Sequence, residues 1–506
     1  MGVVKGRPAN RVVTLPAPVR GLNLISAITG MKPGDALILD NYFPEASWVS
    51  LRGGRTSHKT GFAAAVETLM EYSSTTSKLF AAAGASIFDA TSLGAIGAAV
   101  VTGLTNARWQ HIQFSTTAGD YLVLVNGADG LRTFDGTTWA TQAVTVATAA
   151  SFVDVAVFKN RLWFTYNNST SAWYLPSGAI AGAAVEFDVG PVFRYGGNLA
   201  FIVPISFNAG AGFDQSLCFV STNGEVALYT GTDPASASTF ALSGVFRIGT
   251  PVRQRGYVRY GGDALVLTQD GLVSMLDAMR LDRVQAPNAA ISYNINPVLT
   301  DQIIAQSGTF GWQLIVYGKG TRLLINAPQA NALYHQWAMN TLTKGWGRFK
   351  DQNAVCWGFL SDNLYCAIGT TVYRADTGSS DAGAAISGEV KWAFSVMGTQ
   401  ALKRTAMLRP HLTSNGAPSF AIGINVDFSD QPPTDVPSAA PLTVGLWGDP
   451  WGFIWGGGNN TVRQWTAVSG LGIWLAPRIA STTTGYDIKI NAIDVMYEPA
   501  GRITAA

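Results

Sequence analysis

The sequence has little charge and no long apolar run. Charged residues make up 13% of its 506 residues and the net charge is +2, so the total charge does not favour nucleic acid or acidic membranes as partners. Because no apolar run approaches about 20 residues, we expect no membrane-spanning helix and no membrane insertion. Met1 is followed by polar and basic residues without an apolar signal core, so we expect no standard secretion signal.

Cysteine is too scarce to build a disulfide framework. Cys218, Cys356 and Cys366 are scattered along the chain, and the last two lack the short paired spacing of zinc ligands. Cys218 and Cys366 lie in apolar stretches, which predicts buried free thiols and fits assembly in a reducing cytoplasm. The low charge also indicates that partners cover much of the surface, because charged residues are depleted at interface cores.

The motifs of catalysis and cofactor binding are absent as well. The four histidines form no ligand cluster, and residues 318–321 (GKGT) lack the glycine spacing of a phosphate loop. A glycoside hydrolase needs two carboxylates across the scissile bond. The pairs Asp154 with Glu186 and Asp427 with Asp430 have no supporting pattern for that role. We therefore expect no enzyme activity, no cofactor and no metal site.

One stretch comes near a motif of sialidase-like propellers, the Asp-box. Residues 133–139 (TFDGTTW) are one residue short of its spacing, and the other hairpins of the chain lack it. We therefore expect Asp135 to order a turn and Trp139 to pack against a sheet.

What the chain does have is a recurring hairpin pattern. Residues 120–139 read as an apolar strand, a turn at Asn126-Gly127 or Asp129-Gly130, and a second strand, because these dipeptides tolerate the positive φ of hairpin turns. The same plan recurs at residues 78–89, 160–175, 216–229, 263–276, 322–337 and 363–376. Successive starts lie roughly 40–60 residues apart, near the period of a propeller blade.

A single four-stranded blade cannot bury both of its faces, so such blades stack around an axis. The pattern therefore predicts a β-propeller, and chance recurrence of hairpins in another all-β protein is the alternative. The intervals 175–216 and 276–322 are longer than the others, and we interpret both as insertions on one rim of the ring. Within the second, residues 294–307 predict a short helix with Val298, Ile303 and Ile304 on one side.

The two ends of the chain differ from this repeat. The first twenty residues, basic and rich in proline, predict an extended arm. Residues 32–35 predict a turn that opens a short helix over residues 36–40, and residues 42–51 alternate as a strand does. Residues 379–384 (SSDAGA) are typical of a linker, and the strands expected after it predict a β-sandwich. The expected domains are therefore 1–60, an N-terminal arm and platform segment; 61–380, the propeller with rim insertions; and 381–506, the sandwich.

Several stretches, taken in order, resemble a known family. They are residues 20–23 (RGLN), 31–36 (MKPGDA), 39–44 (LDNYFP), 344–349 (KGWGRF), 363–365 (NLY), 371–376 (TVYRAD), 465–468 (WTAV) and 494–498 (DVMYE). The resemblance is to the tail nozzle proteins of short-tailed bacteriophages (podoviruses), also called head–tail stabilisation or tail tubular B proteins. It touches both ends of the chain and its middle.

The resemblance implies a fold, a role and partners. The N-terminal segment packs with the last domain as a platform, and the propeller is inserted between them. The subunit is a structural virion protein of the viral tail, assembled in the host bacterial cytoplasm into a homohexamer. That ring forms the distal DNA conduit for DNA ejection, docks to an adaptor ring and holds tail spikes or fibres. A propeller-type glycoside hydrolase or depolymerase, or a receptor-binding tail protein, is the alternative.

Candidate interface residues come from these motifs and from two further clusters. Arg247, Arg253, Arg255 and Arg259 lie close together in sequence, which favours a subunit interface or surface over a DNA site. A conduit would give only transient, non-specific contact with double-stranded DNA, because a strongly basic lining would retain the genome. Five tryptophans from Trp447 to Trp474 are typical of a sandwich edge or subunit contact. The full set of candidates is Arg20, Gly21, Asn23, Asp40, Asn41, Phe43, Pro44, Arg253, Arg255, Trp346, Trp451 and Trp465.

Overall fold

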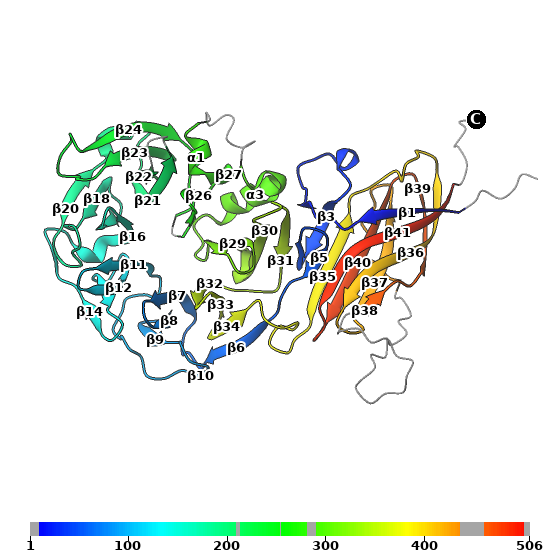
Figure 1. Ribbon diagram of the computed structural model, residues 1–506, viewed down its shortest axis with the longest axis horizontal. Helices are drawn as coiled ribbons and strands as arrows, with labels where there is room; N and C mark the ends of the chain where they lie inside the picture. Colours follow the sequence, from blue (N-terminus) through cyan, green and yellow to red (C-terminus); the bar gives the residue numbers. More distant parts are fainter. Residues whose placement is uncertain (1–9, 209–212, 254, 281–289, 436–459, 500–506) are drawn as a thin grey trace, which may run out of the picture. The chain divides into compact units, whose positions relative to one another are not determined.

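The computed structural model describes residues 10–208, 213–253, 255–280, 290–435 and 460–499. The chain divides into two compact units: unit 1 is Met1–Thr56, Trp337–Lys350 and Asp376–Ala506, and unit 2 is Ser57–Gln336 and Asp351–Ala375. The expected all-β architecture is confirmed, with a propeller inserted between an N-terminal segment and a C-terminal β-sandwich (Figure 1).

Unit 2 is a propeller, and its described residues form seven antiparallel blades. Blade 1 is β7 (Val66–Ser73), β8 (Ser77–Ala83) and β9 (Ser86–Asp89); blade 2 is β11 (Gln110–Thr116), β12 (Gly119–Val125), β13 (Arg132–Phe134) and β14 (Trp139–Thr141); blade 3 is β16 (Phe152–Phe158), β17 (Arg161–Tyr166), β18 (Ser171–Tyr174) and β20 (Val185–Asp188); blade 4 is β21 (Leu199–Asn208), β22 (Phe213–Ser221), β23 (Glu225–Gly231) and β24 (Phe240–Arg247). Blade 5 is β25 (Tyr257–Tyr260), β26 (Asp263–Thr268) and β27 (Gly271–Ser274); blade 6 is β28 (Gln313–Tyr317), β29 (Arg322–Pro328) and β30 (Tyr334–Asn340); blade 7 is β32 (Cys356–Leu360), β33 (Asn363–Ile368) and β34 (Thr371–Ala375).

The seven predicted hairpins are the second and third strands of these blades, so the repeat is confirmed. In the hairpin of blade 2, Gly127 adopts φ of +72°, which is the region that the expected turn requires. The Asn126 side chain accepts hydrogen bonds from the N–H groups of Ala128 and Asp129 and so holds the loop between β12 and β13.

Each blade is apolar on both faces because it is covered by a neighbour on each side. Along β12, Leu122 and Leu124 pack towards blade 1, while Val123 and Val125 pack towards blade 3. Successive side chains of a strand point to opposite faces, so burial of both faces needs a continuous apolar run. This is why the hairpins are recognisable in the sequence.

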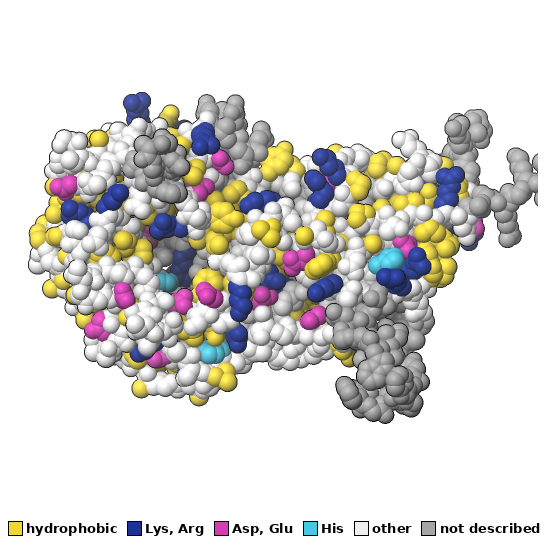
Figure 2. All heavy atoms as spheres, in the orientation of Figure 1, with side chains coloured by type: hydrophobic (Ala, Val, Ile, Leu, Met, Phe, Trp, Pro, Cys, Tyr) yellow, Lys and Arg dark blue, Asp and Glu magenta, His cyan; other side chains and the backbone are white. Residues whose placement is uncertain are grey.

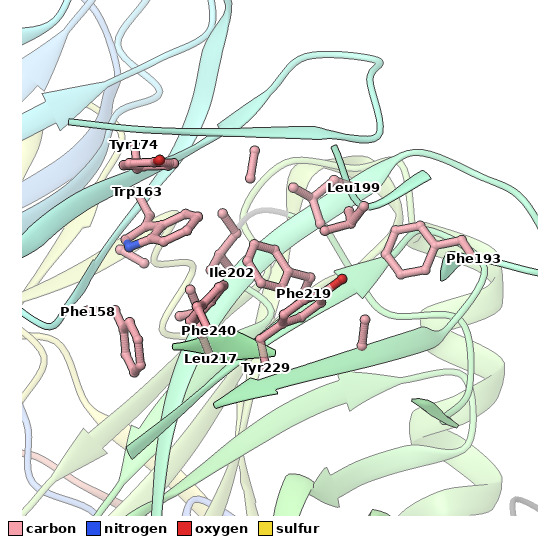
Figure 3. Packing of buried hydrophobic residues seen from close by; sticks show 14 residues of the cluster. Phe158, Trp163, Tyr174, Phe193, Leu199, Ile202, Leu217, Phe219, Tyr229 and Phe240 are labelled. Carbon is pink, nitrogen blue, oxygen red and sulfur yellow. The ribbon is translucent and has the colours of Figure 1, made fainter. Parts of the chain in front are cut away.

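The cluster between blades 3 and 4 shows how aromatic side chains fill these gaps (Figure 3). Trp163 is fully buried, and its ring centroid lies 5.7 Å from that of Phe219 in an edge-to-face arrangement. Tyr229 and Phe240 stack with centroids 5.3 Å apart. Aromatic pairs of this geometry add about 0.5–1.5 kcal/mol beyond the area that they bury.

The ring closes by a strand from the beginning of the chain. Neighbouring blades contact one another in order around the ring, mostly through their inner strands and between blades 4 and 5 through β21 and β26, and β32 contacts β7 again. β6 (Arg55–Thr60), which leads into unit 2, lies beside β34 on the outer side of blade 7, and the short β10 (Gly94–Ala95) pairs with it in parallel. Apolar side chains of blades 1 and 7, including Leu79 and Val372, share one buried cluster.

The two long intervals differ in part from the prediction. α3 (Asn296–Gln306) confirms the expected helix, but its buried apolar residues are Leu299 and Ile303, whereas Val298 and Ile304 are 41% and 62% exposed. Leu299 and Ile303 are four positions apart, so they share one face of the helix, and this is the face that is buried. The interval 175–216 is more than a rim insertion, because it supplies β20 as the outer strand of blade 3.

The described residues of unit 1 form two sheets, in which N-terminal strands pair with C-terminal ones. One sheet has the order β38-β36-β41-β5-β4, with β1 beside β41 and β39 beside β36; the other runs β31-β2-β3-β35-β40-β37 within unit 1. The strands are β1 (Arg11–Pro16), β2 (Gly21–Leu22), β3 (Asp35–Asp40), β4 (Tyr42–Pro44), β5 (Val49–Leu51), β31 (Trp346–Phe349), β35 (Ile386–Trp392), β36 (Lys403–Ser414), β37 (Ser419–Val426), β38 (Asn460–Val462), β39 (Thr466–Gly472), β40 (Leu475–Thr483) and β41 (Ile488–Pro499).

Three predictions about segments of unit 1 are wrong, two of them near the N-terminus and one in the middle of the chain. The described part of the extended arm is strand β1, which pairs with β41 and buries Leu15. The helix expected over residues 36–40 is strand β3, because pairing with β2 on one side and β35 on the other overrides local preference. The segment Trp337–Lys350 was expected within the propeller domain, but it belongs to unit 1. Parallel pairing of β31 with β2 and β3 accounts for this.

Gly21→Ala tests whether the parallel contact between β2 and β31 holds unit 1 together. Gly21 has φ of +77°, and a Cβ there would lie 2.3 Å from the backbone nitrogen of Trp346. We expect this substitution to lower the free energy of unfolding by more than about 2 kcal/mol in equilibrium denaturation. Gly30→Ala is the matched control, because a Cβ at Gly30 meets nothing within 4 Å. Equal stability of the two variants would contradict the close approach.

Candidate functional site

Most of the motif stretches of the resemblance lie in unit 1, where several of their residues surround buried carboxylates, whereas residues 363–365 and 371–375 lie in unit 2. Asp35 is buried; Arg20 Nε donates to its Oδ1 at 2.8 Å and Asn23 Nδ2 to its Oδ2 at 2.9 Å. The backbone N–H of Lys32 donates to the same Oδ2 at 3.1 Å. Charge-assisted bonds of this kind are about twice as strong as neutral ones, so the cluster fixes the loop between β2 and β3.

A second carboxylate lies at the end of β3. Arg348 binds Asp40 in a bidentate arrangement, with Nε–Oδ1 and Nη2–Oδ2 distances of 2.7 and 2.9 Å. Lys350 Nζ lies 2.6 Å from Oδ2 of the same carboxylate. Asp40 therefore has two cationic partners, and both come from the segment that interrupts the propeller sequence.

Asn41 connects this pair to a third, more deeply buried cluster. Asn41 has φ of +57°, and its Oδ1 accepts hydrogen bonds from Arg52 Nε at 2.9 Å and from the Lys350 N–H at 2.8 Å. Arg52 binds Asp381 through both terminal nitrogens, at 2.9 and 2.6 Å, and the side chains of both are at most 5% exposed. Arg55 approaches Asp381 Oδ2 at 3.1 Å.

Sequence reasoning missed Asp381, because it placed residues 379–384 in a linker. A single Asp in a stretch of Ser, Ala and Gly carries no local signal of burial. Only its partner Arg52, more than 300 residues earlier, reveals its role. The other motif candidates are structural too. Phe43 and Trp346 are buried in the core, and the carbonyl of Pro44 accepts a hydrogen bond from Asn340.

The four arginines that are close in sequence do not form one patch. Arg247 stacks on Tyr195 at 4.0 Å, and Arg253 and Arg259 line different cavities of unit 2. Arg255 donates to the carbonyls of Glu67 and Trp109 and to Thr68 Oγ1. Arg255 therefore joins blade 5 to the beginnings of blades 1 and 2. These contacts lie within one subunit and not at a subunit interface.

The carboxylates considered for hydrolysis are separated by structure. Asp154 is on the inner strand β16 and Glu186 on the outer strand β20, at opposite edges of blade 3. In unit 1, Asp430 binds Lys391 and Arg478, while Asp427 accepts the N–H groups of Ile473 and Trp474. Asp154 and Glu186 therefore do not flank one substrate position, as a glycosidase pair must, and Asp427 and Asp430 are each held by structural contacts.

The remaining sequence candidates have structural contacts. Asp135 Oδ1 accepts the N–H groups of Thr137 and Thr138, and Trp139 packs edge-to-face on Phe80 at 4.9 Å, which confirms both expectations. Arg409 lies over the Trp465 ring at 4.6 Å. Trp451 lies outside the described residues.

The three cysteines, Cys218, Cys356 and Cys366, are buried thiols, as expected for Cys218 and Cys366, and burial raises the pKa of the Cys356 thiol to about 12. Among the described residues, no three His, Cys, Asp or Glu side chains are grouped to hold a metal ion. Within the same part of the chain, no helix has both the length and the apolar content for crossing a bilayer.

No protein-family model matches this chain, and no curated protein matches its sequence. Solved structures with partial similarity include BBS1N in complex with ARL6DN, soaked with lead (TM-score 0.38, 12% identity, 64% of this chain and 98% of that chain) and soaked with mercury (0.39, 10%, 62% and 94%). Another is the WD40 β-propeller domain of Doa1 (0.38, 8%, 63% and 96%).

Asp381→Asn tests the buried network of unit 1. Removing the charge leaves Arg52 buried without its bidentate partner, so we expect a loss of about 3–5 kcal/mol in the free energy of unfolding. Asp233→Asn is the control, because Asp233 is half exposed and pairs with Arg161 at 3.3 Å; such surface pairs contribute about 0–1 kcal/mol. Denaturant titration followed by tryptophan fluorescence measures both, and similar losses would contradict the network's role.

Asp154 predicts a pH dependence of stability. Burial raises the pKa of Asp154 from 3.8 to about 7, although Tyr257 donates a hydrogen bond to its carboxylate at 2.8 Å. Because the folded value lies above the unfolded one, the unfolded chain binds fewer protons between these pH values, and stability falls as the pH rises through about 7. We expect Asp154→Asn to flatten this fall in thermal melts between pH 4 and pH 8. A variant with the same pH slope as the parent would exclude Asp154 as its source.

Proposed function

We propose that this chain is a structural ring subunit of a short-tailed phage tail, a homohexameric nozzle that forms the distal DNA conduit. In this role it docks to an adaptor ring and holds tail spikes or fibres. The proposal rests on the ordered resemblance to tail nozzle proteins. One structural observation carries it further: residues of the matching stretches near both ends and the middle of the chain lie together in unit 1.

The contacts of those residues suit a platform whose segments must stay together under force. Asp40 takes its partners Arg348 and Lys350 from a segment about 300 residues later, and Arg52 takes Asp381. Breaking a buried pair costs several kcal/mol, so the segments of unit 1 are held together by more than apolar contact. A subunit that transmits force during DNA ejection needs such connections.

The electrostatics of the whole chain also suit a conduit. Each cation held on a phosphate adds salt-dependent affinity, so a strongly basic wall would retain DNA. The net charge is +2, and Arg255 is engaged with backbone carbonyls inside unit 2. On the face shown in Figure 2, cationic and anionic side chains are interspersed on unit 2. We propose that Asp, Glu, Asn, Gln and Thr mainly line the passage through the hexamer.

Oligomeric state separates this proposal from its rivals. Mass photometry of the purified protein, alone and mixed with its adaptor ring protein, should show particles six times the mass of the 53.5 kDa chain, at least in the mixture. A receptor-binding fibre would be a trimer that binds whole cells, and a depolymerase would release reducing sugar from host polysaccharide. Either result, with no sixfold species in the mixture, would contradict the nozzle.

A further inference from the structure

The axis of the propeller contains a cavity that the tail role does not use. Strands β7, β11, β25, β28 and β32 line a space of about 490 Å³. A second space of about 660 Å³ lies beside β28 and the turn after β32, and Glu71 lines both. Figure 2 shows a hollow at the middle of unit 2. Ligand sites typically have about 300–1,000 Å³, so the channel is large enough for a small molecule or a short peptide.

Two side chains of opposite charge, Glu71 and Arg259, line the first of these spaces. Glu71 is on β7 of blade 1 and Arg259 on β25 of blade 5, and these blades lie on opposite sides of the ring. Among the described residues no ion pair joins them, and no side chain or backbone group pairs with the Arg259 guanidinium. Arg259 is exposed to the channel. Each charge is therefore available to a ligand.

Glu71 is held in place without a cationic partner. Its Oε1 accepts a hydrogen bond from the N–H of Ser361 at 3.1 Å. Burial and, to a lesser extent, the nearby Asp362 raise the pKa of Glu71 above its usual range. Lys319, at the same mouth of the channel, donates instead to Asn363 Oδ1 at 3.1 Å. An ammonium group at this position would relieve the repulsion between the two carboxylates.

The walls between the two charges are neutral. Desolvation and then the charge of Arg255 lower the pKa of His111, although its ring is exposed to the cavity, and this favours the uncharged ring at pH 7. Gln313 is satisfied by the backbone N–H and carbonyl of Trp357. Val258, Val316 and Phe359 add apolar surface. The first space therefore combines apolar and uncharged polar walls with one anionic side chain, Glu71, and one cationic side chain, Arg259.

We propose that the propeller channel binds a short peptide by its free ends, with the ammonium group at Glu71 and the carboxylate at Arg259. A charge-separated ligand complements the two uncompensated side chains, and the apolar wall accommodates side chains between them. Arginine suits the carboxylate end because its planar fork forms two parallel hydrogen bonds. This binding is independent of the hexameric tail role, so either proposal can fail without the other.

The experiment is calorimetric titration of the full chain with four forms of a Gly-Leu-Gly tripeptide: unblocked, N-acetylated, C-amidated and blocked at both ends. We expect saturable binding of the unblocked form and about a tenfold weaker Kd for each single blocking group. Glu71→Gln should weaken the unblocked form about tenfold and leave the N-acetylated form unchanged. Arg259→Gln should weaken the unblocked form about tenfold and leave the C-amidated form unchanged.

Controls separate binding from folding. Glu71→Gln keeps an oxygen that accepts the Ser361 N–H, and each variant is checked by thermal melting. Glu186→Gln removes a carboxylate from the outer strand of blade 3, where Ser171 binds it, and should leave all four affinities unchanged. No saturable binding of the unblocked peptide, equal binding of all four forms, or a loss in Glu186→Gln equal to that in Glu71→Gln would overturn the proposal.

Discussion

The structure of unit 2 depends on the burial of every blade on both faces. A strand such as β12 sends alternate side chains to the blade before it and the blade after it, so no blade is stable without two neighbours. The first and last blades meet this requirement only because the ring closes, with β6 at the outer side of blade 7 and a shared cluster between blades 1 and 7. Arg255 adds a polar connection between blade 5 and the start of blades 1 and 2.

Unit 1 depends on a different kind of connection. Its strands come from three separated parts of the chain, and buried ion pairs join these parts: Arg348 with Asp40 and Arg52 with Asp381. Burying charges costs free energy that good geometry and extra hydrogen bonds offset. Such pairs are therefore better suited to specifying which segments meet than to adding stability. Asp40, Asn41 and Arg348, which belong to stretches of the resemblance, take part in this network.

The propeller could be predicted because its signals are local. A two-residue turn and two apolar strands are contained in about 15 residues, and the pattern is repeated. The errors lie where distant pairing decides the outcome. β3 was expected as a helix because the turn at residues 32–35 was interpreted as a helix start, whereas pairing with β2 and β35 makes it a strand. Asp381 was missed for the same reason, since its partner Arg52 is remote in sequence. The channel charges Glu71 and Arg259 lie on strands of different blades, so no sequence spacing reveals that they face one cavity.

We propose that the closed propeller of unit 2 and the ion-paired segments of unit 1 belong to one structural subunit of a sixfold ring. Electron cryo-microscopy of the purified protein assembled with its adaptor tests this claim most directly. The account predicts six copies around an open axis, each with Arg52 bound to Asp381 in unit 1. A map that shows three copies in a fibre, or a single copy with the platform segments separated, would contradict it.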